Sequence, residues 1–330
     1  MSLILSPGRR RLLQIAALTS VPAWHSSHAD NAAAFPSRGL RCVLGFPPGG
    51  AVDANARVIC TKLADYWKQP VVIENRGGAG STIGTALVAA AAPDGYTFLI
   101  SSPAHAINAT LYKKLPYDTE KAFVPVAQLT SSPLFVYLHP SVPAKSIREL
   151  VALAKSQPGK LNYGSSGSGT STHLAAALFN MTAQTDIVHI PFSGGGPVYS
   201  ALLANTVQLT FGGVEGLSHV RAGKLRAIAV TTSKRFAAAP EWPTVAESGL
   251  PGYEVEAWYG VYVPAGTPAA VVDKMNADIN RVLAMPAVQE QYGKMGLEVK
   301  NTTPAQFAAF TRSEIETWRK VITTANIQIE

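Results

Sequence analysis

Short apolar runs alternate along this chain with stretches whose apolar residues recur every three or four positions. Leu40–Phe46 is typical of a strand, and in Asp53–Trp67 the apolar residues from Ala56 to Tyr66 follow helical spacing. The alternation continues with strands at 70–74 and 96–100 and an alanine-rich helix at 82–92. Strands and helices in this order predict parallel sheets with helices on both faces.

A second block repeats the pattern, and the chain ends in helices. Predicted helices lie at 146–156, 171–181, 197–204, near 217–222, at 269–285 and at 304–326, with a short segment near 288–295. Predicted strands lie at 161–163, 187–190, 207–211 and 225–230.

Two long extended segments separate these blocks. Residues 126–139 and 254–263 are apolar, extended and free of helical periodicity, and each is placed to cross between domains. Two adjacent crossings form a hinge. We therefore expect domain 1 to comprise 38–132 plus 259–330, and domain 2 to comprise 133–258. One large continuous sheet is the alternative.

Glycine-rich turns follow four of the predicted strands and precede helices. They are FPPGGAV (46–52), NRGGAGSTIG (75–84), GSSGSGTSTH (164–173) and PFSGGGPVYS (191–200). The first amides of a helix lack partners within it and carry partial positive charge, while glycine lets a ligand approach the backbone. Such turns bind an anion without a basic side chain. None contains the Gly-Lys-Ser/Thr of a nucleotide P-loop, and any single turn is also explained by tight loop geometry.

The N-terminus has the layout of an export signal. Arg9, Arg10 and Arg11 precede a short apolar run, and small residues near Ala29 resemble a cleavage point, so residues 1–29 are predicted to be a signal peptide. Either general secretory or twin-arginine export fits. No other segment is apolar enough over the roughly 20 residues that span a membrane, which predicts an exported, soluble, periplasmic protein.

Charge and composition narrow the partners. The net charge is +7, and removing the three arginines of residues 1–29 leaves +4. The basic residues are scattered, so nucleic acid is not expected, whereas a mild positive field favours small anions. Cys42 and Cys60 are either buried thiols or a disulfide. No metal-ligand spacing is present, so no metal and no cofactor are expected.

Catalytic groups are scarce. His173 follows the serine-rich turn and could act as a base for Ser166, Ser168 or Ser171, but the G-x-S-x-G elbow is absent. His189, within an apolar strand, fits a core histidine. We expect no enzyme, with an exported serine/histidine hydrolase as the alternative. Trp258 and Tyr259 either line a cleft or pack at the hinge.

The motifs together resemble one family. FPPGGAVDANAR, QPVVIENRGGAGSTIG, AAPDGYTFLI, PGKLNYGSSGSGTSTHLAAALF, VHIPFSGGGP, HVRAGKLRAIAV and AWYGVYVPAGTP occur in the order found in the Bug family, the extracytoplasmic solute receptors of tripartite tricarboxylate transporters. The resemblance extends from about Leu40 to the end. It implies an α/β, two-domain Venus-flytrap fold of mainly parallel sheets, in which an interdomain cleft captures a small organic carboxylate. It also implies membrane transporter subunits as partners. A ligand-sensing input to a membrane kinase is the alternative, and we expect a monomer.

The resemblance also implies which residues bind the ligand, and further candidate residues come from the turns and strand ends around them. Asp53 has a simpler interpretation as a residue of the first helical turn. The candidates are Phe46, Pro48, Gly49, Gly50, Asp53, Gly78, Ala79, Gly80, Ser101, Ser102, His105, Ser165, Ser166, Thr170, His173, Phe192, Gly194, Gly195, Phe211 and Gly212. Of these, Ser101, Ser102 and His105 are expected in the loop after the third strand.

Two departures from the family pattern bear on the ligand. Val52 replaces a hydroxyl-bearing residue before Asp53, and Gly212-Gly213 follow Phe211 where an acidic or small polar residue is common. Without a carboxylate there, a ligand ammonium lacks a partner. We therefore expect a carboxylate without an α-amino group, whose identity the sequence leaves open.

Overall fold

The computed structural model describes residues 35–328, so the predicted signal peptide lies outside the described residues. The strands are β1 (Leu40–Leu44), β2 (Val71–Asn75), β3 (Thr97–Ser101), β4 (Phe123–Pro133), β5 (Phe135–Leu138), β6 (Asn162–Ser165), β7 (Val188–Pro191), β8 (Leu209–Gly212), β9 (Arg226–Val230), β10 (Glu256–Pro264) and β11 (Glu298–Val299). The α-helices are α1 (Ala51–Trp67), α2 (Thr82–Ala89), α3 (Ala104–Leu111), α4 (Ile147–Ser156), α5 (Ser171–Ala183), α6 (Gly195–Leu203), α7 (Leu217–Arg221), α8 (Ala269–Leu283), α9 (Pro286–Lys294) and α10 (Pro304–Thr324). Two 3₁₀ turns, η1 (Ala79–Ser81) and η2 (Val214–Gly216), precede α2 and α7.

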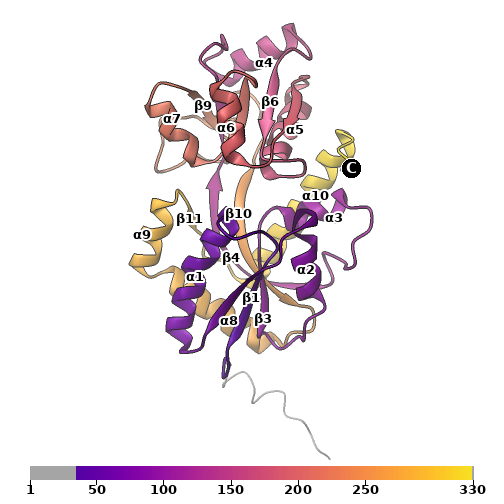
Figure 1. The fold of residues 1–330 in the computed structure, drawn as a ribbon, viewed down its shortest axis with the longest axis vertical. Coiled ribbons are helices and arrows are strands. Elements are labelled where there is room, and N and C mark those ends of the chain that lie inside the picture. Colours follow the sequence, from indigo (N-terminus) through magenta and orange to yellow (C-terminus); the bar gives the residue numbers. More distant parts are fainter. Residues whose placement is uncertain (1–34, 329–330) are drawn as a thin grey trace, which may run out of the picture.

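The strands form two separate sheets, one in each lobe of the molecule (Figure 1). The six-stranded sheet has the order β11-β4-β10-β3-β1-β2, and the five-stranded sheet has the order β7-β6-β8-β5-β9. Both are mixed: β1 pairs in parallel with β2 and β3, and β6 with β7 and β8, whereas β4, β5, β9, β10 and β11 pair antiparallel. The α/β two-sheet prediction is confirmed, but antiparallel pairing is more extensive than expected.

The two extended segments form the connection between the lobes. β4 pairs antiparallel with β10 along its length in the first sheet, and Leu134 alone separates β4 from β5 of the second sheet. β4 and β10 stand between the lobes in Figure 1. The predicted boundary at 258/259 falls within β10, whose residues 256–258 pair with β4. The assignment of two independently moving domains stays a prediction.

Period-two alternation places the two faces of the first sheet in different cores. Cys42 and Leu44 face the cluster formed with α1, α8 and α9, while Val43 and Leu99 face the cluster formed with α2, α3 and α10. The second cluster continues through α4 and α5 of the other lobe. Cys42 and Cys60 are buried free thiols, which resolves that alternative, and burial raises the pKa of Cys42 well above its usual range.

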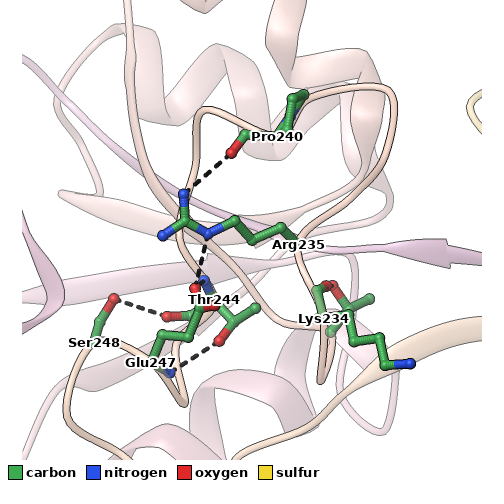
Figure 2. A network of polar contacts seen from close by, with 7 residues as sticks. Lys234, Arg235, Pro240, Thr244, Glu247 and Ser248 are labelled. Atoms are coloured by element: carbon green, nitrogen blue, oxygen red, sulfur yellow. Dashed lines mark hydrogen bonds and ion pairs between the residues drawn. The ribbon is translucent and has the colours of Figure 1, made fainter.

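One helix of the fold was not anticipated. Residues 104–111 form α3 rather than a loop. The helix begins after Pro103, has no side-chain cap to mark its start in the sequence, and packs against α10. Residues 231–255, between β9 and β10, form no α-helix or extended strand and are held by polar contacts. The Arg235 Nε donates to Glu247 Oε2 at 3.0 Å, and the Thr244 amide donates to the same oxygen at 2.9 Å (Figure 2).

Candidate functional site

The first wall of the candidate site is the carboxyl edge of β1, β2 and β3. Since these strands are parallel, the turns that follow them lie at one edge of the sheet. The first turn leads into α1, whose N-cap Gly50 has φ −81° and ψ 173° and supplies no side-chain cap. The N-terminal amides of α1 therefore have no side-chain partner of this kind.

The second wall is built in the same way from the other sheet. β6 and β7 are parallel, and their following turns lead into α5 and α6. Thr170 caps α5 by accepting from the His173 amide, while Gly194, at φ 151°, begins α6 without a side-chain cap. A φ in this range is open to glycine and strained for other residues, which explains a glycine at this position.

The two walls enclose a cavity of about 430 Å³, closed at the hinge by Ala257 and Tyr259 of β10. Eight of the predicted site residues line it: Phe46, Gly50, Gly80, Ser102, Ser166, Thr170, Gly194 and Gly195. Thirteen further residues line it: Pro47, Ala51, Val52, Pro103, Ala104, Asn108, Leu111, Tyr112, Ser168, Gly169, Ser171, Ala257 and Tyr259. None of these side chains is charged at neutral pH, so polar recognition falls to backbone amides, hydroxyls and one side-chain amide.

Twelve predicted site residues do not line this cavity: Pro48, Gly49, Asp53, Gly78, Ala79, Ser101, His105, Ser165, His173, Phe192, Phe211 and Gly212. Seven of the twelve are buried, and the other five are exposed or half-buried. Pro48 and Gly49 are exposed at the tip of the first turn, whereas Phe211 is fully buried in β8. Ligand binding by any of the twenty residues stays a prediction.

Asp53 organises the first wall from inside. Its carboxylate accepts from the Gly49 amide at 2.9 Å, from Arg57 Nε at 2.7 Å and from Asn75 Nδ2 at 3.1 Å. The hydrogen bond from Arg57 is the main reason why the pKa of Asp53 is lowered. Because Asn75 also donates to the Phe46 carbonyl, this cluster fixes the turns after β1 and β2 relative to each other.

His105 lies on the far side of α3 from the cavity. Its ring stacks on Tyr262 at 4.3 Å between ring centroids, and it lines a small separate cavity of about 80 Å³. Burial lowers its pKa to about 3. The expectation that His105 lies in a loop was wrong, because it lies in α3. This helix has only eight residues and follows Pro103, so its helical spacing was a weak signal in the sequence.

His173 and His189 form a stacked pair behind the second wall. Their ring centroids are 3.8 Å apart, and burial lowers their pKa values to about 3 and about 4. His173 Nδ1 accepts from the Gly169 amide at 3.1 Å, and His189 Nε2 lies 2.6 Å from Ser165 Oγ. Since Ser165 is fully buried, this serine–histidine pair has no access to a substrate in the cavity.

The hinge aromatics divide between the two roles that the sequence allowed. Trp258 is fully buried and donates through Nε1 to Glu314 Oε2 at 2.6 Å. Tyr259 lines the cavity. The alternation of side chains along β10 sends one residue to each face.

One acidic residue near the cavity was missed. Glu215, in η2, lies four positions after Phe211, and its Oε1 accepts from the Tyr199 hydroxyl at 3.3 Å. Gly212 and Gly213 directly follow Phe211, as the sequence shows, and the carboxylate comes two residues later, at Glu215. The only sequence signal was a lone acid between glycines, which reads as an ordinary turn residue.

A larger cavity of about 790 Å³ lies elsewhere, between β4, β11 and α10 and residues 232–236. Its charged lining is balanced: Lys234, Arg235, Lys300, Lys320, Glu254, Glu256, Glu298 and Glu314. Size favours this cavity, but none of the four glycine-rich turns reaches it. The smaller cavity, where four helix N-termini meet, is therefore the candidate ligand site.

Within 35–328, no group of three or more His, Cys, Asp or Glu side chains is arranged to hold a metal ion. No helix in that part of the chain combines the length and apolar character needed to cross a membrane.

The chain matches known proteins over most of its length. The family model described as "Tripartite tricarboxylate transporter family receptor" matches residues 55–327. A Pseudomonas sp. (strain P51) protein encoded in the tcbD-tcbE intergenic region is 40% identical over 96% of this chain and 94% of its own length.

Two solved structures from Rhodopseudomonas palustris share the fold. One, solved with adipate, is 33% identical with a TM-score of 0.78, covering 89% of this chain and 99% of the other. The second, MatC with bound malate, is 34% identical with a TM-score of 0.74, covering 87% of this chain and 100% of the other.

Proposed function

This chain belongs to the tripartite tricarboxylate transporter receptor family, which confirms the resemblance to Bug receptors, and we propose that it captures a small organic carboxylate between its two lobes. The observation that carries this proposal is the meeting of uncapped helix N-termini at a cavity lined by uncharged side chains. Two relatives of the same fold hold adipate and malate, which are small carboxylates.

The mechanism is binding by main-chain amides. A hydrogen bond to a charged group contributes roughly 1.5–3 kcal/mol, and micromolar affinity needs about 8 kcal/mol. Three or four amide contacts with one carboxylate, together with apolar contact to Phe46, Val52 and Leu111, reach this range after the losses of association. Closure of the lobes about β4 and β10 would exclude water from these contacts.

Family membership supports the proposed partners and location. The protein is exported to the periplasm by the signal in residues 1–29, and the closed, loaded form delivers its ligand to membrane transporter subunits. A family of substrate-binding receptors and a buried Ser165–His189 pair both support binding without catalysis.

A thermal-shift screen against small carboxylates tests the proposal. Ligand at one hundred times its Kd stabilises the folded state by about 2.7 kcal/mol, which raises the Tm by roughly 5 °C for a chain of this size. Adipate, malate and their homologues form the panel, and native mass spectrometry of the exported protein identifies any co-purified acid. If no carboxylate raises the Tm and none co-purifies, the proposal is wrong.

A further inference from the structure

A carboxylate lies directly behind the uncharged lining of the cavity. A methyl group built on Gly195, which lines the cavity, would lie 4.0 Å from Glu215 Oε1. The same carboxylate accepts from the Tyr199 hydroxyl and covers Gly213, where a built methyl would collide with it. Glu215 is exposed and lies next to the lining residue Gly195, although it is not itself a lining residue.

The charge of Glu215 also reaches the hinge side of the cavity. Tyr259 lines the cavity from β10, and after burial the charge of Glu215 is the second cause that raises the pKa of this tyrosine to about 12. Among the described residues, no Lys, Arg or His lies within ion-pair distance of Glu215. No ion pair among the described residues therefore neutralises the negative charge of Glu215.

The opposite wall has the opposite polarity. The first turn of α1 and the start of α3 line the cavity without side-chain caps, and helix N-termini carry partial positive charge. The side chain of Asp53 does not cancel this field, because its carboxylate is held by Arg57 and Asn75. Near Gly195 the partial positive charge of the α6 N-terminus, roughly half a unit charge, is opposed by the full negative charge of Glu215, so the second wall is more negative than the α1 wall.

We propose that Glu215 determines specificity by accepting a hydrogen bond from the end of the ligand remote from its bound carboxylate. This inference rests on the proposed function and narrows its ligand class. The favoured ligand carries one carboxylate for the α1 wall and an ammonium or hydroxyl group for Glu215. A second carboxylate at that end would meet a like charge and bind less well.

Calorimetric titration with matched pairs of ligands tests the inference. Each dicarboxylate is compared with the amino acid of the same length: succinate with γ-aminobutyrate, glutarate with δ-aminovalerate, and adipate with ε-aminocaproate. Glu215→Gln keeps the size of the side chain and an acceptor for Tyr199 while removing the charge. Glu241→Gln, an exposed acid of the same lobe that does not line the cavity, is the control.

The wild type is expected to bind the amino member of at least one pair roughly tenfold or more tightly than the dicarboxylate, and Glu215→Gln to abolish or reverse this preference. Glu241→Gln should leave the preference unchanged. If dicarboxylates bind as tightly as their amino partners, or Glu215→Gln leaves the ratio unaltered, the role of Glu215 is refuted while carboxylate capture stands. If no ligand of either kind binds in the titrations or in the carboxylate screen, both proposals fail.

Discussion

Gly50 offers the sharpest test of anion binding by the amides of α1. Its φ of −81° and ψ of 173° suit any residue, and a methyl built on it meets only the Pro47 carbonyl oxygen at 3.7 Å. Asp is a preferred N-cap residue, so Gly50→Asp places a carboxylate on the amides that we assign to the ligand. The fold should tolerate this change and gain a few tenths of a kcal/mol from the new cap.

The same substitution should nearly abolish binding. Two negative charges about 4 Å apart repel by about 4 kcal/mol at an effective dielectric constant of 20, which corresponds to a Kd about a thousandfold higher. Gly50→Asn is the matched variant, because it caps the helix and has the same size but no charge. Its smaller loss of affinity measures the steric part alone.

Calorimetry with the carboxylate that gives the largest thermal shift provides the affinities, and urea unfolding provides the stabilities. We expect Gly50→Asp to be as stable as the wild type and to bind far more weakly than Gly50→Asn. Equal affinities for the Asp and Asn variants, or unchanged affinity in Gly50→Asp, would show that the α1 amides do not hold the ligand's charge.

Three further predictions concern stability. His105 is neutral in the fold with a pKa of about 3, whereas in the unfolded chain it takes up a proton below pH 6.5, so the wild type loses stability on acidification. Replacing His105 by Phe should remove about 2 kcal/mol of the loss in unfolding free energy between pH 7 and pH 5. Equal slopes of unfolding free energy against pH in both proteins would contradict this. Glu314 accepts from the indoles of Trp258 and Trp318, so Glu314→Leu should lower the unfolding free energy by roughly 2–4 kcal/mol, measured in urea, while Glu314→Gln retains an acceptor and most of the stability. A methyl on Gly260 would collide with the Phe307 ring, so Gly260→Ala should destabilise the fold by about 1–3 kcal/mol. Gly293→Ala, in open space on α9, should stabilise it by about 0.5–1 kcal/mol. Changes of the opposite sign in the unfolding free energy, measured by denaturation, would contradict the packing described at these two positions.

Much of the fold and part of the site followed from the sequence alone. The alternation of strands and helices, the breaks at glycine and proline, and the N-cap Ser146 of α4 are local signals, and the structure has them within a few residues. The glycine-rich turns located the cavity, because in parallel sheets the turns after the strands must gather at one edge.

Tertiary structure alone decided which residues of those turns line the cavity. Gly50 and Gly80 line the cavity while Gly49 and Gly78 do not, and one-residue differences of this kind depend on how each turn is held, as by Asp53. The approach of Glu215 to Gly195 joins turns 20 residues apart, each following a different strand of the second sheet, and no local pattern encodes it. Local sequence specifies φ, ψ and polarity one segment at a time, whereas the charge distribution of a cavity arises only when separate segments pack together.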